Sequence, residues 1–261
     1  MHNFDFVKPS SIAEAVKALS AEGAQALSGG QTLIPTMKQR LAAPAVLVSL
    51  TGIKEMQGVC TGDGGLHIGA ATPHAVVARE AAKHYPALAK LAGGIGDPQV
   101  RNRGTIGGSL ANNDPSACYP AGALASGATI VTNNRKIKAD DYFQGLFTTA
   151  LAEGEIITEV VFPIPEQAAY AKFDQPASRF ALAAVFVARF KDGVRVAVTG
   201  ASNDGVFRWT AAEKALSASF SASAIAGLTV DGSNMISDLH GTGAYRAHLV
   251  KVLTGRAVAA A

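Results

Sequence analysis

The chain has 261 residues, of which 48% are hydrophobic and 16% are charged, with 23 Lys and Arg against 20 Asp and Glu. This composition excludes intrinsic disorder, and the absence of any basic run argues against a nucleic-acid partner. No apolar stretch reaches the roughly 18 to 20 residues that a membrane-spanning helix needs. With neither a signal core nor a disulfide-rich pattern, we expect a cytoplasmic protein without a membrane span.

The first third of the chain predicts alternating strands and helices. Ser11 and Glu14 have the spacing of a capping box, which favours a helix over 11–22 that ends at Gly23. After this helix we expect, in chain order, a buried strand at 24–28, a tight loop at Gly29 and Gly30, a helix at 32–41, and strands at 46–50 and 65–70.

The middle of the chain continues this alternation but contains one glycine-rich stretch. Thr72 and Pro73 predict the start of a helix over 73–83, and a second helix is expected at 86–92. Residues 93–114 include six glycines and show almost no periodicity, which indicates a long glycine-rich loop that is either ordered or functional. Beyond it we expect a helix near 119–126 and strands near 128–133 and 155–162.

A domain boundary is expected near 165–172, after Pro163 and Pro165. Residues 179–189 and 194–201 read as two antiparallel strands joined by a turn at 191–193, followed by Ala-rich and Ser-rich helices. The sequence therefore predicts an α+β protein with a first domain at 1–168, divided into lobes at about 1–54 and 55–168, and a C-terminal domain at 169–261.

Several common kinds of site are excluded by the residues themselves. Two cysteines, Cys60 and Cys118, are too few for an iron–sulfur cluster, and the six histidines show no metal-binding spacing. Residues 107–111 are one residue short of a nucleophile elbow and follow a loop rather than a strand. Neither a P-loop nor a dinucleotide-binding fingerprint is present, which argues against a Rossmann-type NAD site.

Two glycine clusters remain as candidates for anion binding. They are Ser28, Gly29, Gly30, Gln31 and Thr32, and, 77 positions later, Thr105, Ile106, Gly107, Gly108 and Ser109. Paired glycines let backbone N–H groups approach an anion, and flanking hydroxyls donate further hydrogen bonds. The first cluster also opens onto a predicted helix, whose N-terminus favours negative charge. Both turns suit a pyrophosphate, although each glycine pair alone is more often a simple turn.

The segments that contain these clusters resemble the two FAD-binding motifs in the medium subunit of molybdenum hydroxylases, the family of carbon monoxide, xanthine and aldehyde dehydrogenases. The similar segments are Leu27–Lys38 (LSGGQTLIPTMK) and Ile95–Ser109 (IGDPQVRNRGTIGGS). Shorter pieces resemble the family in the same order: Phe4–Phe6 with Pro9, Asn113–Pro115, Tyr142–Phe143, Gly154–Ile157 and Tyr245–Arg246. The resemblance covers nearly the whole chain.

The resemblance implies a two-lobed FAD-binding domain of the vanillyl-alcohol-oxidase type, followed by a small C-terminal domain. It also implies that the glycine motifs hold the FAD pyrophosphate, that Ile95 and Ile157 pack around the flavin, and that Asp114 lies nearby. Lys172, Arg179 and Tyr142 have either flavin-facing, partner-facing or purely structural roles, and Arg101 and Arg103 brace the glycine loop or face a partner. Two positions depart from the family pattern, with Ser109 in place of Asn and Cys118 in place of an acidic residue that helps hold the ribose–adenine half of FAD.

The function implied by the resemblance is electron transfer within a complex. A large subunit with molybdopterin oxidises the substrate, a small subunit carries two [2Fe-2S] clusters, and this chain carries FAD, with a dimer of heterotrimers as the expected assembly. Two alternatives stay open from the sequence: a self-contained flavin oxidase or dehydrogenase, and a binding module that has lost its flavin. Neither the substrate nor the final acceptor follows from these residues.

Overall fold

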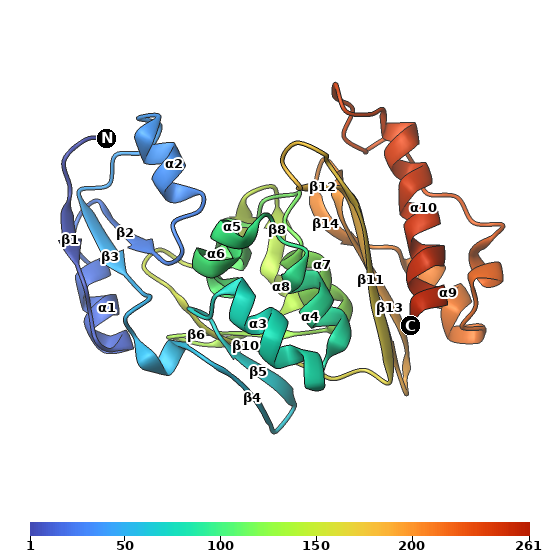
Figure 1. Ribbon diagram of the computed structural model, residues 1–261, viewed down its shortest axis with the longest axis horizontal. Coiled ribbons are helices and arrows are strands. Elements are labelled where there is room, and N and C mark those ends of the chain that lie inside the picture. The colour runs from blue at the N-terminus through green and yellow to red at the C-terminus, as the bar shows by residue number, and fades with distance from the viewer.

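The computed structural model describes residues 1–261, with three main β-sheets following one another along the longest axis of the molecule (Figure 1). None of its helices combines the length and the apolar character needed to cross a bilayer. The mixture of helices and strands confirms the predicted α+β class.

The N-terminal lobe is a small parallel sheet in the order β1-β3-β2 with two helices. Its elements are β1 (Asp5–Val7), α1 (Ile12–Leu19), β2 (Ala24–Leu27), α2 (Leu33–Lys38) and β3 (Val46–Ser49). The Ser11 side chain accepts a hydrogen bond from the Glu14 amide at 3.2 Å, which confirms the predicted helix start, although the helix ends at Leu19. The predicted strand at 24–28 is present as β2, but it is partly exposed rather than buried because it forms an edge of the sheet.

The second lobe is built on a five-stranded antiparallel sheet in the order β4-β5-β10-β6-β7. Its strands are β4 (Val59–Gly62), β5 (Gly65–Gly69), β6 (Thr129–Thr132), β7 (Lys136–Lys138) and β10 (Ile157–Phe162), with the hairpin β8 (Phe143–Gly145) and β9 (Thr148–Thr149) beside it. Its helices are η1 (Lys54–Met56), α3 (His74–Glu80), η2 (Ala81–Lys83), α4 (Pro86–Gly93), α5 (Pro98–Arg103), α6 (Ile106–Asn112), α7 (Tyr119–Ser126) and α8 (Ala139–Tyr142).

Two expectations for this lobe were wrong. Thr72 does not cap α3, because its hydroxyl is bonded to the backbone of Gly58, and Pro73 occupies the cap position. Residues 93–114 are not one long loop but contain α5 and α6. These short helices lack apolar periodicity and are started instead by side-chain caps, Asp97 accepting from the Val100 amide at 2.8 Å and Thr105 from the Gly108 amide at 3.2 Å.

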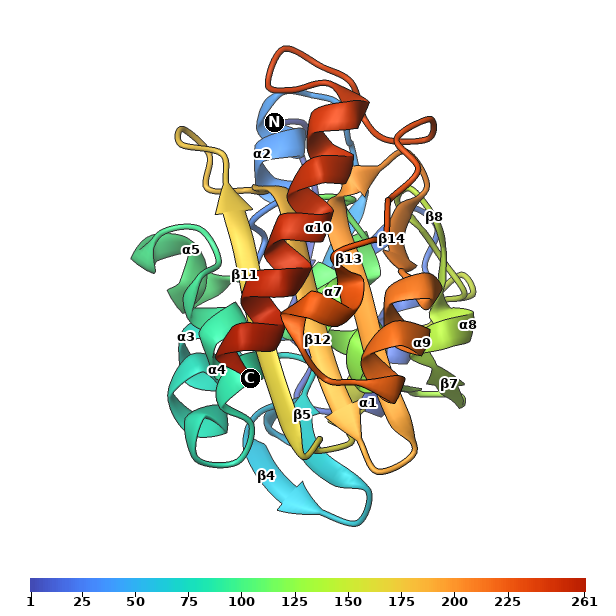
Figure 2. The same ribbon diagram turned by 90° about the vertical axis from the view of Figure 1, so that its right-hand side faces the viewer.

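The C-terminal unit is a four-stranded antiparallel meander, with its own helices on one face (Figure 2) and the second lobe on the other (Figure 1). Its elements are β11 (Gln167–Asp174), β12 (Ala181–Phe190), β13 (Gly193–Ser202), β14 (Gly205–Arg208), α9 (Thr210–Ala218), η3 (Ala222–Ile225) and α10 (Gly243–Ala260). Successive residues of β12 enter different cores, since Phe186 packs with the second lobe whereas Val185 and Val187 pack with the cluster that includes α9 and α10. A strand covered on both faces reads as a continuous apolar run, as β12 does.

Candidate functional site

A cavity of about 530 Å³ is lined by segments from all three units. The N-terminal lobe contributes the end of β2 and the turn before α2, the second lobe contributes residues around α5, α6 and the start of β10, and the C-terminal unit contributes Lys172 and residues 178–180. This volume lies within the range of small-molecule and cofactor sites. No group of three metal-ligating side chains is present in the structure.

The first glycine motif presents unbonded backbone donors to this cavity. None of the amide N–H groups of residues 29–33 donates a hydrogen bond to another group of the protein. Gly30 has φ of +68°, a left-handed conformation that favours glycine, and it turns the chain from β2 into α2. A row of free amides at the start of a helix is a good binding site for an anionic group.

The second glycine motif is built differently, which corrects the expectation that both motifs offer free amides. Its amides from Ile106 onward are already bonded within the protein: Ile106 to the Thr72 carbonyl, Gly107 to the Ala70 carbonyl at 2.9 Å, and Gly108 to the Thr105 hydroxyl. The reason is that these residues form the first turn of α6, packed against β5. A Cβ on Gly107 would lie 2.6 Å from the Ala70 Cβ, so glycine is needed here for close packing.

The two motifs contact each other directly, although they are far apart in sequence. The Ser28 and Thr105 hydroxyl oxygens are 2.7 Å apart and share a hydrogen bond. A Cβ on Gly29 would overlap the backbone of Arg103 and Gly104, so the backbones meet at van der Waals distance. The turn that carries the free amides is therefore held directly against the segment that leads into the second motif.

Nearly all of the predicted site residues line this one cavity. They are Ser28, Gly29, Gly30, Gln31, Thr32, Ile95, Thr105, Gly107, Gly108, Ser109, Asp114, Cys118 and Ile157. Ile106 does not, because its side chain is fully buried in the core. Of the three residues with open roles, Lys172 and Arg179 reach the cavity, whereas Tyr142 is fully buried and donates to the Leu110 carbonyl.

His74 is a cavity residue that sequence reasoning missed, because an isolated histidine carries no spacing signal. It lies at the start of α3 and is 4% exposed, and its Nδ1 has no hydrogen-bond partner. Burial, together with the positive charge of Arg101, lowers the pKa of His74 to about 4. The imidazole is therefore neutral at neutral pH, and its ring packs closely against Gly104.

Arginine side chains fix the short segment that carries Ile95. Arg101 donates from Nη1 to the carbonyl oxygens of Ile95 at 3.0 Å and Gly96 at 2.8 Å. Arg179, which has a left-handed φ of +60°, reaches the same Gly96 oxygen at 3.5 Å. The apolar Ile95 wall is thus held from both the second lobe and the C-terminal unit.

Lys172 places a buried positive charge at the edge of the cavity. Its ammonium donates to the carbonyl oxygens of Gly94 at 3.0 Å and Arg179 at 2.6 Å, and it pairs with Asp174 at 2.8 Å. Burial raises the pKa of the neighbouring Cys118 thiol, an effect that Lys172 and the Tyr170 hydroxyl partly oppose. Cys118 is 5% exposed and lines the cavity as a neutral thiol.

These features fit FAD. The free amides of residues 29–33 match a pyrophosphate, and the apolar side chains around Ile95 and Ile157 match a flat aromatic ring. The ionisable side chains at the cavity are largely engaged with other protein groups.

Comparisons with known proteins agree with this assignment. Residues 2–165 match the family described as the FAD binding domain in molybdopterin dehydrogenase. The chain is 35% identical to the nicotine 6-hydroxylase medium subunit of Paenarthrobacter nicotinovorans, over 97% of this chain and 95% of that one. It is 33% identical to the glyceraldehyde dehydrogenase medium chain of Sulfolobus acidocaldarius, over 97% and 96%. The solved CO dehydrogenase from Oligotropha carboxidovorans superimposes with a TM-score of 0.87 at 31% identity, covering 99% of this chain and 97% of that one.

Proposed function

The chain belongs to the family of FAD-binding domains of molybdopterin dehydrogenases, and from that membership we propose that it is the electron-transfer subunit of a heterotrimeric molybdopterin hydroxylase. It is an FAD-binding medium subunit and part of an oxidoreductase. In our proposal, electrons pass from two [2Fe-2S] clusters of a small subunit through FAD to an external acceptor, and a large molybdopterin subunit oxidises the substrate. We further propose a cytoplasmic dimer of heterotrimers, and a division of the chain at residues 168 and 169.

The observation that carries the proposal is the row of free amides at residues 29–33. We assign the FAD pyrophosphate to these amides, with the Ser28 and Thr105 hydroxyls and the surface of Gly107, Gly108 and Ser109 beside them. Ile95 and Ile157 provide apolar contacts for the flavin ring. Asp114 and Cys118 complete the polar edge, with Cys118 toward the ribose–adenine half.

Bound FAD supplies the chemistry by accepting electrons singly and releasing them in pairs. The residues of this chain supply position and polarity. Lys172 holds a positive charge that is anchored by two carbonyl oxygens and Asp174. A pKa of about 4 makes His74 a weak base and leaves no imidazolium to donate a proton at neutral pH. The Glu155 carboxylate is engaged in an ion pair, so both residues are poor candidates for acid–base work in substrate hydroxylation.

Purification of the chain together with its partner subunits tests the proposal. We expect FAD in the complex, and we expect electrons from the substrate to reach an artificial acceptor only when this chain carries its flavin. The matched control is the complex assembled with flavin-free chain. Oxidation of an organic donor by this chain alone would favour the self-contained flavin enzyme instead, and a chain that takes up no flavin would indicate a binding module.

A further inference from the structure

The cavity wall next to Ile157 is formed by a segment with little regular structure. Residues 150–156 connect β9 to β10, and Leu151, Glu155, Ile156 and Ile157 line the cavity. Few backbone hydrogen bonds hold this connection. One of them runs from the Glu155 amide to the Ala152 carbonyl at 3.1 Å. Something beyond the backbone must therefore keep the wall in one conformation.

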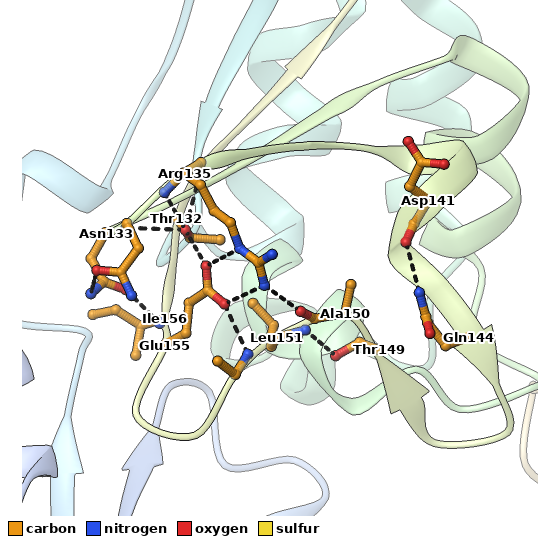
Figure 3. A network of polar contacts seen from close by, with 12 residues as sticks. Thr132, Asn133, Arg135, Asp141, Gln144, Thr149, Ala150, Leu151, Glu155 and Ile156 are labelled. Carbon is orange, nitrogen blue, oxygen red and sulfur yellow. Dashed lines mark hydrogen bonds and ion pairs between the residues drawn. The ribbon is translucent and has the colours of Figure 1, made fainter.

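The Glu155 carboxylate supplies that restraint by accepting four hydrogen bonds (Figure 3). Oε1 accepts from the Thr132 hydroxyl at 2.6 Å and from Arg135 Nε at 3.0 Å. Oε2 accepts from Arg135 Nη2 at 2.9 Å and from the Ala152 amide at 2.8 Å. Arg135 also donates to the Ala150 carbonyl at 2.6 Å, so the same two side chains fix both ends of the segment.

The next residue is tied to the same strand end. The backbone amide of Ile156 donates to the Asn133 side-chain oxygen at 2.8 Å, and the backbone amide of Asn133 donates to the Ile156 carbonyl at 3.1 Å. Thr132, Asn133 and Arg135 all lie at the turn between β6 and β7. The segment that lines the cavity is therefore hydrogen-bonded to the turn between β6 and β7.

The carboxylate itself is buried. Only 1% of the Glu155 side chain is exposed, whereas 51% of the Arg135 side chain is exposed. Hydrogen bonding from Arg135 lowers the pKa of Glu155 to about 2, so the carboxylate is ionised at any pH above about 4. Glu155 thus acts on a cavity occupant through the position of its neighbours.

We propose that Glu155, held by Arg135 and Thr132, is a positioning residue that sets the Ile156–Ile157 wall against the flavin ring. The proposal rests on the proposed function, because it takes FAD as the occupant of the cavity. Such a residue affects both how tightly FAD binds and the environment of its ring. A residue that only stabilised the fold would leave the flavin spectrum unchanged.

The test compares Glu155→Gln with Glu213→Gln in the full chain. Glu213 is a matched control because its side chain is 9% exposed, pairs with Arg208 at 2.7 Å and accepts from the Val196 amide at 2.9 Å, yet it does not line the cavity. We expect both variants to unfold at lower urea concentration than the unmodified chain. Only Glu155→Gln is expected to weaken FAD binding and to change the visible circular dichroism of bound flavin. The loss of affinity should be about tenfold or less, because the weakened charge-assisted hydrogen bonds lie between Glu155 and Arg135 and act on FAD only through the wall.

Each outcome decides the question. Equal FAD affinity and identical visible spectra for Glu155→Gln and the unmodified chain would overturn the proposal, as would equal spectral changes in Glu213→Gln. If Glu155→Gln does not fold, Thr132→Val removes one hydrogen bond to the carboxylate and is judged by the same two readouts. If the unmodified chain itself binds no FAD, the proposed function fails first, and that result is distinct from a failure of the positioning role.

Discussion

His74 should make the stability of the flavin-free chain depend on pH. Its pKa is lowered to about 4 in the folded state, mainly by burial, whereas an unfolded histidine titrates near 6.5. Between these values the unfolded chain binds a proton that the folded chain does not, so the free energy of unfolding decreases as the pH falls. At 1.36 kcal/mol per pKa unit, the decrease between pH 7 and pH 5 is about 2 kcal/mol.

Urea denaturation of the full chain at pH 7 and pH 5 measures this effect. Glutamine at position 74 cannot take up the proton, so His74→Gln should lose most of the pH dependence in this window, even if its stability is lower overall. Carboxylates whose pKa is lowered in the folded state, such as Glu155, affect the free energy of unfolding mainly at lower pH than this window. His248→Gln, at an exposed position, serves as the control and should keep the full dependence. If His74→Gln and the unmodified chain show the same decrease, the assignment of a buried neutral imidazole is wrong.

Three further predictions concern FAD. Acid precipitation should release the flavin into the supernatant, because the glycine motifs carry no attachment residue; colour retained in the pellet would contradict this. Cys118→Asp supplies a carboxylate that can accept a hydrogen bond from the ribose hydroxyls or the adenine amine of FAD. FAD titration should show about ten- to a hundredfold tighter binding, corresponding to about 1.5 to 3 kcal/mol for a hydrogen bond to a charged group; equal or weaker binding by a folded variant would refute it. Gly107→Ala should strongly lower the thermal unfolding midpoint, because the new Cβ meets Ala70. Gly108→Ala should stay folded and lose FAD affinity. A destabilised Gly108→Ala together with a stable Gly107→Ala that binds FAD weakly would show that the roles of these glycines are misassigned.

The sequence was most informative where the local conformation or burial of a segment demanded one type of residue. Gly29 and Gly30 marked the turn that carries the free amides, and the apolar run of β12 marked the central strand of the C-terminal sheet. The helices α5 and α6 were missed because they are short and have no apolar stripe, although Asp97 and Thr105 are good capping residues.

The cavity itself was harder to predict than its motifs. His74 approaches the glycine motifs only through packing of α3 against Gly104, and Lys172 reaches Gly94 from a strand that sequence periodicity did not predict. The different bonding of the two glycine motifs also depends on tertiary contacts, since the Gly107 amide finds its acceptor at Ala70, outside the motif. Contacts of this kind leave no local pattern in the sequence.

The lining of the cavity begins at Gln25 and ends at Phe180, and this has a consequence for how the protein is made. During synthesis, the free amides at residues 29–33 emerge long before Lys172 and Arg179. Those later residues take their places only when β11 pairs with β12, and β12 in turn needs β13, which ends at Ser202. A nascent chain therefore has no complete pocket until more than three quarters of it has left the ribosome.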